Sequence, residues 1–386
     1  MNTAWKQIPA SNARPIAKRA APDLSDATDA VPKTSGMGPK DPLQGEQRQA
    51  GTRARGRWRN WALALGGTLA ALLAAEATLS ALGFSFPLYP EKIEFGWPDP
   101  VWLESFYQPD DDLLWVRKDY AETLTRLARE RPQLVLLGDS CLELGNYDEY
   151  VAQRLGEHGG GRVRMAKLGT AGWSTYQGLR QLERDVVGLR PALVTVHFGW
   201  NDHWMGFGIE DAEVGRLRSP LVSLLERSRV FQLGMKARVM AVRGGRVNPL
   251  RVPPSDFRDN LRQIVATAGA HGITAALLTA PTSHRRGREP SYLLLRQIED
   301  LDQLVPLHQR YVEIVREVAE ETRAPLCDLE RDFAALPEPD IARSFENDGI
   351  HLTKGPGEGY DRLAGFLFDC FERERLLGRL VEAGAP

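Results

Sequence analysis

The sequence contains few cysteines and no excess of charge of either sign. Its 386 residues include three cysteines, 49 Lys or Arg and 51 Asp or Glu, which gives a formal net charge of -2. Cys141, Cys327 and Cys370 are odd in number, far apart and without metal-ligand spacing, so we expect neither a disulfide framework nor a metal site. The balanced charge lacks the basic footprint of nucleic-acid-binding proteins, so no nucleic-acid partner is expected.

Long apolar runs are also scarce, and one occurs near the N-terminus. Residues 1–60 have no sustained apolar period and are rich in basic residues, which indicates a disordered basic tail. The run Trp61–Phe84 follows, with Glu76 as its single charge. About 20 apolar residues cross the hydrocarbon core as a helix, and basic flanks favour the cytoplasmic side. The pattern predicts a single-pass inner-membrane protein whose N-terminus is cytoplasmic and whose C-terminal part lies on the periplasmic or extracytoplasmic side.

Two alternatives to an uncleaved anchor remain open for this run. A cleaved signal peptide usually has a shorter basic region and a shorter apolar core. A soluble helix would normally show a polar stripe, and none is visible between Trp61 and Phe84. Glu76 costs a few kcal/mol where it faces lipid and less where it reaches the interface.

The rest of the chain divides into a connector and a domain with alternating patterns. Residues 85–130 are rich in proline and aromatic residues. We expect this connector either to lie near the membrane interface or to wrap the following domain. From residue 131, short apolar runs typical of buried strands alternate with helical periods. This alternation predicts an α/β fold with helices on both faces of a mostly parallel sheet of about five strands. Residues 203–254 interrupt the pattern and are interpreted as a mostly helical insertion.

The expected elements can be given by their ranges. The expected strands are Gln133–Gly138, Val163–Leu168, Ala192–Phe198, Ile273–Ala280 and Ala324–Leu329. The expected helices are Asp148–Leu155, Thr175–Val187, Asp256–Ala270, Asp300–Glu320 and Gly359–Arg375.

Three short blocks follow expected strands, where an open parallel sheet binds its ligands. In Gly138-Asp139-Ser140, a serine at a strand-to-helix turn points its hydroxyl out of the sheet. The block at 168–175 has two glycines that can present an unblocked amide. In the block at 199–202, the Asn201 amide can donate to an oxyanion, which is worth about 3–4 kcal/mol of barrier. Alone, each of the first two blocks is more typical of an ordinary turn or helix cap, and the third is equally typical of either.

A fourth block, at residues 348–353, supplies a candidate base. Asp348 stands three residues before His351, so its carboxylate can accept the imidazole Nδ1–H and leave Nε2 free to take a serine proton. Among the seven histidines, His351 alone has this partner at this spacing. The others are expected to be structural or peripheral (His197, His203, His284) or on the surface (His158, His271, His308).

Together and in this order, the four blocks resemble those of the SGNH, or GDSL, hydrolase family. In that family the blocks carry Ser, Gly, Asn and His in turn. The resemblance implies Ser140 as nucleophile, His351 as general base and Asp348 as its orienting acid. It also implies Gly172 and Asn201 as oxyanion donors, together with the Ser140 amide.

The resemblance covers residues 131–376 and implies a flavodoxin-like three-layer sandwich. One departure concerns the second block, where the family usually has an Asn five residues before its glycine and this chain has Lys167. This leaves Gly169 as an alternative donor. Gly172 is preferred because an aromatic residue and then Ser174-Thr175 follow it. The segments 257–261 and 345–348 also look like those of members that carry an N-terminal anchor.

The implied activity is that of a serine esterase that works through an acyl-enzyme. No metal or organic cofactor is needed for this chemistry. The expected substrates are O-acyl esters of envelope carbohydrates, ahead of lipid or other carboxylic esters. An O-acyltransferase with the same triad and a catalytically inactive envelope binding module remain the alternatives. The insertion at 203–254 is expected to shape the substrate pocket.

Overall fold

The computed structural model describes residues 43–85, 105–157, 163–206, 210–217, 224–225, 227–243, 249–295 and 297–382. The chain divides into two compact units, Met1–Thr68 and Leu69–Pro386. The described residues of the first unit form the start of helix α1, and the second unit holds all the remaining described elements.

Helix α1 runs from Leu43 to Ala81. Its segment Asn60–Ala81 has 22 residues and a mean hydropathy of 1.6, which is long and apolar enough to cross a membrane. The helix begins well before the apolar run, so the expected disorder is wrong for residues 43–60. Gln, Glu, Arg and Ala are good helix formers, and extending a helix that has already nucleated costs little. Residues 1–42 of the expected tail lie outside the described residues.

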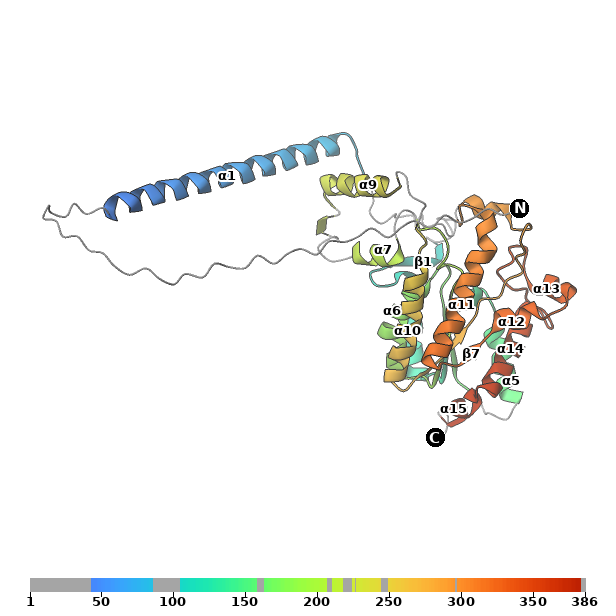
Figure 1. Cartoon of the computed structure of the whole chain (residues 1–386). Coiled ribbons are helices and arrows are strands. Elements are labelled where there is room, and N and C mark those ends of the chain that lie inside the picture. Colours follow the sequence, from blue (N-terminus) through green and yellow to red (C-terminus); the bar gives the residue numbers. More distant parts are fainter. Residues whose placement is uncertain are drawn as a thin grey trace, which may run out of the picture. The chain divides into compact units, whose positions relative to one another are not determined.

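Five parallel strands form the sheet that organises the second unit (Figure 1). They are β3 (Leu134–Gly138), β4 (Met165–Gly169), β5 (Leu193–His197), β6 (Thr274–Leu278) and β7 (Leu326–Cys327). Their order is β4-β3-β5-β6-β7, and every neighbouring pair is parallel. This is the flavodoxin-like strand order. The order in which the strands are added reverses between β3 and β5, although all five strands run parallel. The predicted fold class is confirmed, as is each of the five expected strands to within a few residues.

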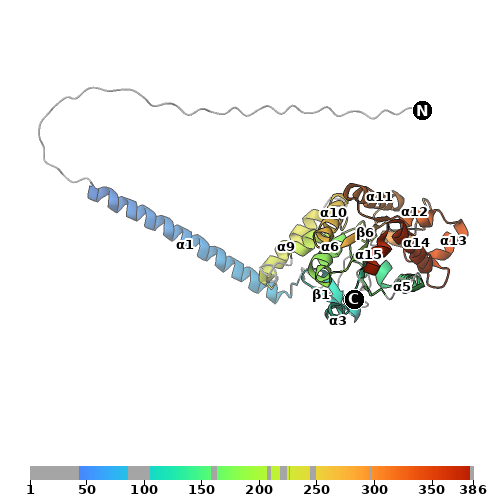
Figure 2. The ribbon, with the colours of Figure 1, turned by 90° about the horizontal axis from the view of Figure 1, so that it is seen from below.

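The strands bury both faces, which explains why their sequences are almost continuously apolar. Successive side chains of β3 point to opposite faces, so Val135 and Leu137 join one core cluster while Leu134 and Leu136 join another. Figures 1 and 2 show the helices on both sides of the sheet. On the first side lie α6 (Thr175–Gln181), α10 (Pro254–Ala270) and α11 (Leu304–Thr322). On the second side lie α5 (Tyr147–Glu157), α12 (Leu329–Ala334), α14 (Gly359–Arg373) and α15 (Leu376–Glu382).

The expected helices are present, with one local difference. The stretch expected as one helix over Thr175–Val187 is α6 followed by a π-helical turn, Leu182–Val186, and a 3-10 turn, Val187–Leu189. Arg190 then adopts the left-handed conformation that ends the segment. The short helices that were not expected from the sequence include α12 and α15, together with α4 (Ser140–Glu143) and α13 (Glu338–Ser344).

The described part of the connector packs against the domain. It forms an antiparallel hairpin, β1 (Tyr107–Asp110) and β2 (Leu114–Arg117), followed by α3 (Tyr120–Glu130). Trp115 and Val116 are buried in the same cluster as the first face of the sheet. Of the two interpretations left open by the sequence, wrapping the domain therefore holds for residues 105–130. Residues 86–104 lie outside the described residues.

The described residues of the insertion include two helices. Its described helices are α7 (Asp211–Leu217) and α9 (Arg229–Arg243), and an isolated bridge between Met205 and Leu250 closes its base. The carboxylate of Glu76, from the apolar segment of α1, accepts hydrogen bonds from the Ser228 hydroxyl and from the Arg229 and Val230 amides. The single charge of the apolar run is thus paired with the first turn of α9.

The cysteines give a correction. Cys327 of β7 and Cys370 of α14 form a disulfide, although no disulfide was expected. Their sequence separation of 43 residues hid the pairing, because the sequence alone does not show that α14 packs across the end of β7. Cys141 is the remaining cysteine of the chain and is buried and free.

We predict that removing this disulfide destabilises the domain without changing the fold. For a loop of this size the chain-entropy relation gives about 4 kcal/mol, and measured losses are commonly about 2–5 kcal/mol. Denaturant unfolding of the Cys327→Ala/Cys370→Ala variant should show a loss in that range. Treating the wild type with a thiol reductant should reproduce the loss, whereas the double variant should not respond. Equal stability of the oxidised and reduced wild type would contradict the prediction.

Candidate active site

A continuous hydrogen-bonded chain joins the three residues expected to form a triad. Ser140 begins α4 at the carboxyl end of β3, and its Oγ lies 2.9 Å from His351 Nε2. His351 Nδ1 lies 2.5 Å from Asp348 Oδ2. The other Asp348 oxygen accepts the amides of Ile350 and His351, each at 2.9 Å. The acidic end of the chain is therefore fixed by its own loop.

The electrostatics of this loop set the charge of the imidazole. Burial lowers the pKa of His351, but the hydrogen bond and charge of Asp348, with the charge of Asp139, outweigh it and raise the pKa above its ordinary value. Burial likewise opposes the ionised form of Asp348. The hydrogen bonds to His351 and to two backbone amides nevertheless lower the pKa of that carboxyl. The arrangement therefore favours an ionised Asp348 beside an imidazole that readily accepts a proton.

Close backbone approach positions Ser140. The amide of Cys141 donates to the carboxylate of Asp139 at 2.9 Å and caps the turn. A Cβ added at Gly138 would lie 3.0 Å from the His197 carbonyl oxygen, so glycine allows β3 and β5 to approach closely just before Ser140. Burial raises the pKa of the Cys141 thiol well above its ordinary value, which keeps it protonated and unreactive.

Asn201 follows β5, the strand next to β3. Its Nδ2 donates to Asp139 Oδ2 at 3.1 Å, so the residue before Ser140 orients the Asn201 amide. Both side chains are buried. Burial raises the pKa of Asp139, although the hydrogen bonds from Cys141 and Asn201 act in the opposite direction. Asn201 and Ser140 thus lie on either side of the reversal point of the sheet, where folds of this order bind ligands.

Gly172 lies in the turn after β4 with φ +80°, a conformation that favours glycine. Among the described residues, no acceptor pairs with the amide of Gly172 or of Ser140. Gly169, the alternative donor, is the last residue of β4 and is paired with Gly138. A Cβ at Gly169 would lie 2.8 Å from Leu142, so this glycine lets α4 pack on β4. The geometry therefore favours Gly172 over Gly169.

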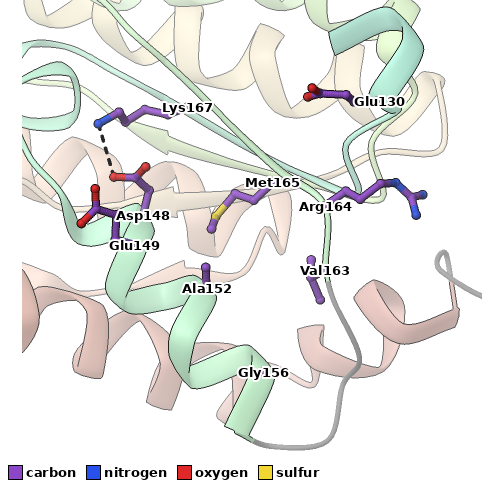
Figure 3. A pocket seen from close by; sticks show the side chains of 9 residues that line it. All are labelled: Glu130, Asp148, Glu149, Ala152, Gly156, Val163, Arg164, Met165 and Lys167. Carbon is purple, nitrogen blue, oxygen red and sulfur yellow. Dashed lines mark ion pairs between the residues drawn. The ribbon is translucent and has the colours of Figure 1, made fainter. Parts of the chain in front are cut away.

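Lys167, where the family usually has Asn, does not contact these residues. Its Nζ donates to the Gly145 carbonyl at 2.9 Å and pairs with Asp148 of α5 at 3.3 Å. The pair borders a hollow along β4, the edge strand (Figure 3). Lys167 itself lies in β4, and its side chain binds the loop that follows α4.

A cluster of buried aromatic and imidazole rings surrounds Trp200, the neighbour of Asn201. His308 stacks on the Trp200 ring at a centroid distance of 3.9 Å, and His203 Nε2 lies 3.1 Å from His308 Nδ1. Burial lowers the pKa of His308 to about 3, so it is neutral. The expected surface position of His308 is wrong, because α11 turns this residue toward the core. His284 Nε2 lies 2.7 Å from the Asp348 carbonyl oxygen and supports the loop of His351.

Several residues that hold the site lie outside the four sequence blocks. They are Trp115, Glu143, Asp211 and Arg251, whose contacts with the Gly172 turn are described below, and His284. Long sequence separations hid them, since no local pattern links them to the blocks. Among the described residues, no group of three or more His, Cys, Asp or Glu side chains could hold a metal ion.

A parallel sheet of this order with a Ser-His-Asp chain at its carboxyl edge is typical of serine hydrolases. A profile of the GDSL-like lipase/acylhydrolase family matches residues 136–360, more than half of the chain. The chain therefore belongs to this family and is an ester-cleaving hydrolase.

The chain is also similar to several solved structures. The lipase/acylhydrolase of Enterococcus faecalis is 18% identical, with 63% of this chain and 96% of that chain covered and a TM-score of 0.42. A GDSL-like lipase from Bacteroides thetaiotaomicron is 18% identical, with 67% and 97% covered and a TM-score of 0.42. The acetylxylan esterase Axe2 from Geobacillus stearothermophilus is 17% identical, with 62% and 92% covered and a TM-score of 0.38. A search of curated proteins found no match.

Because the pKa of His351 is raised, we can predict the pH range in which its imidazole becomes protonated and can no longer accept a proton. Neutral imidazole accepts a proton and imidazolium does not, so the base should be lost as pH falls through a value above about 6.5. An NMR titration of His351 in the Ser140→Ala protein should show this value. Adding Asp348→Asn should move the titration to lower pH, because it removes the negative charge beside the imidazole. A midpoint below 6.5 that Asp348→Asn leaves unchanged would contradict the assignment.

Proposed function

We propose that the protein cleaves O-acyl esters by transferring the acyl group to Ser140 and then to water. The observation that carries this proposal is the chain Ser140 Oγ–His351 Nε2 and His351 Nδ1–Asp348 Oδ2, with lengths of 2.9 and 2.5 Å. In this mechanism Ser140 is the nucleophile, His351 the general base and Asp348 the group that orients the imidazole.

The two steps follow from these positions. Ser140 Oγ attacks the ester carbonyl while His351 Nε2 takes the hydroxyl proton, and His351 then gives this proton to the departing alkoxide. The alcohol leaves, and an ester between Ser140 and the acyl group remains. Water then attacks this acyl-enzyme as its proton passes to His351, and the proton returns to Ser140 when the carboxylic acid departs. The reaction needs no cofactor.

Charge develops on the carbonyl oxygen in both steps. We assign its stabilisation to the amides of Ser140 and Gly172 and to the side chain of Asn201. Two facts support this assignment: both amides lack a protein acceptor among the described residues, and Asn201 is oriented by Asp139 beside the nucleophile. Removing one donor of this kind typically costs about 10²–10³ in kcat.

The most direct test replaces the nucleophile. Ser140→Ala should abolish hydrolysis of a short p-nitrophenyl ester and labelling by a fluorophosphonate, because it removes the hydroxyl that lies 2.9 Å from His351 Nε2. Asp348→Asn should lower kcat by about 10⁴ by disturbing the imidazole tautomer. Ser255→Ala, at an exposed serine of α10, is the matched control and should retain full activity. Wild-type rates in the Ser140→Ala protein would overturn the mechanism.

For the substrate we propose esters on envelope carbohydrates ahead of lipids. The support is the proposed location outside the inner membrane, where acylated polysaccharides occur. The same wild-type and Ser140→Ala proteins should be compared on acetylated glycans, phospholipids and p-nitrophenyl esters of graded length. Serine-dependent release of acetate from the glycans should be the fastest reaction. Faster phospholipid cleavage would reassign the substrate, and acyl transfer to an added sugar in preference to water would make the protein a transferase.

We propose further that α1 anchors the protein with its N-terminus in the cytoplasm and the catalytic unit outside. Basic residues precede the span, and the Cys327–Cys370 disulfide fits an oxidising compartment. Glu76 accepts three hydrogen bonds from the start of α9, which lowers the cost of a carboxylate near the end of the span.

This topology predicts the thiol state of the protein in cells. After rapid acid quenching and alkylation under denaturing conditions, Cys141 alone should be modified until a reductant is added. Cys327 and Cys370 should become reactive only after reduction. Modification of all three cysteines without reduction would place the catalytic unit in a reducing compartment and contradict the proposal.

A further inference from the structure

Three successive peptide groups of the turn after β4 are held from outside the turn. The Ala171 amide donates to Glu143 Oε2 at 2.5 Å, and Trp115 Nε1 donates to the Ala171 carbonyl at 3.1 Å. Arg251 Nη1 donates to the Gly172 carbonyl at 2.7 Å. Between these two held carbonyls lies the Gly172 amide, for which the described residues provide no acceptor. The contacts therefore fix the direction of the amide while leaving it free to bind a ligand.

Arg251 is itself fixed by a buried carboxylate of the insertion. Its Nε and Nη2 donate to the two oxygens of Asp211 at 3.1 and 2.8 Å, a bidentate pair. The side chains are only 3% and 6% exposed. The Asp211 amide donates to the Arg251 carbonyl at 2.8 Å, and the Ser174 hydroxyl donates to Asp211 Oδ2 at 2.7 Å. The guanidinium therefore has one orientation, and its remaining Nη1 points at the turn.

This fixation matters because Gly172 has the φ of +80° given above. Glycine has more accessible backbone conformations than any other residue. The peptide planes on either side of Gly172 therefore need contacts from other residues to hold this one conformation. A buried ion pair is also a poor source of stability, since desolvation of both charges offsets their attraction. The contribution of the Asp211–Arg251 pair is instead to orient the Gly172 carbonyl. Two apolar side chains could not do this.

We infer that Arg251, oriented by Asp211, is a positioning residue that aims the Gly172 amide at the oxyanion. The inference rests on the proposed function, because it assigns the oxyanion to Gly172. It gives the base of the insertion at 203–254 a role in the chemistry of the ester carbonyl. This role requires a guanidinium group, because two of its nitrogen atoms must hold Asp211 while the third donates to the Gly172 carbonyl.

The test is Arg251→Lys, which keeps a positive charge beside Asp211 but replaces the planar guanidinium with a single ammonium group. With a p-nitrophenyl ester, kcat should fall about tenfold to hundredfold, since complete loss of one donor costs about 10²–10³. KM should change by less than about threefold, because the amide acts mainly in the transition state. Affinity for an alkyl boronic acid, which forms a tetrahedral adduct on the serine, should fall by the same factor as kcat. Arg258→Lys, at a partly buried arginine of α10 that pairs with Glu317 and Glu321, is the matched control and should leave all three values unchanged.

A second variant and a second measurement separate positioning from folding. Arg251→Met/Asp211→Leu removes both charges and leaves neither buried alone, so it should unfold near the wild-type temperature and show the same loss of kcat. Hydrogen exchange at the Trp173 amide, which donates to the Thr170 carbonyl at 3.1 Å, should become faster in both variants. Wild-type kcat, or wild-type exchange at Trp173, in a folded variant would overturn the inference. Failure of the proposed function itself would show separately, as activity retained by Ser140→Ala.

Discussion

The hydrogen bond between Ser140 Oγ and His351 Nε2 joins residues 211 positions apart in the chain. The two residues can meet only when the sheet has formed. Ser140 follows β3 and His351 lies in the loop before α14, and the fold places both at the carboxyl edge of the sheet. The parallel order β4-β3-β5-β6-β7 places the carboxyl ends of the strands together. The Cys327–Cys370 disulfide joins β7, an edge strand of this sheet, to α14. Much of the fold can therefore be understood as the support for this one contact.

A second constraint concerns the groups that face the developing oxyanion. Asn201 is held by Asp139, and the turn of Gly172 is held by Glu143 from α4, Trp115 from the N-terminal hairpin and Arg251 from the insertion. In the sequence, the hairpin precedes β3 and the insertion follows it. Elements outside the four sequence blocks thus carry the side chains that orient them, and the site depends on the whole unit.

The sequence predicted the sheet and the site blocks because both are encoded locally. Short apolar runs marked the strands, and the spacing of Asp348 and His351 marked the imidazole loop. Features that depend on distant packing were missed. The Cys327–Cys370 bond required knowing that α14 crosses β7, and the buried position of His308 required knowing which face of α11 meets Trp200. Helix α1 beyond its apolar run was missed because the sequence indicated disorder where helix propensity prevailed.

The central claim is that Ser140 carries the acyl group during turnover. Rapid mixing of the full chain with a p-nitrophenyl ester, acid quenching and peptide mass mapping measure this directly. The account predicts a burst of nitrophenol of up to one equivalent and an acyl adduct on the peptide that contains Ser140, lost again as turnover proceeds. An adduct on another residue, or turnover that labels no residue while hydrolysis continues in Ser140→Ala, would contradict it.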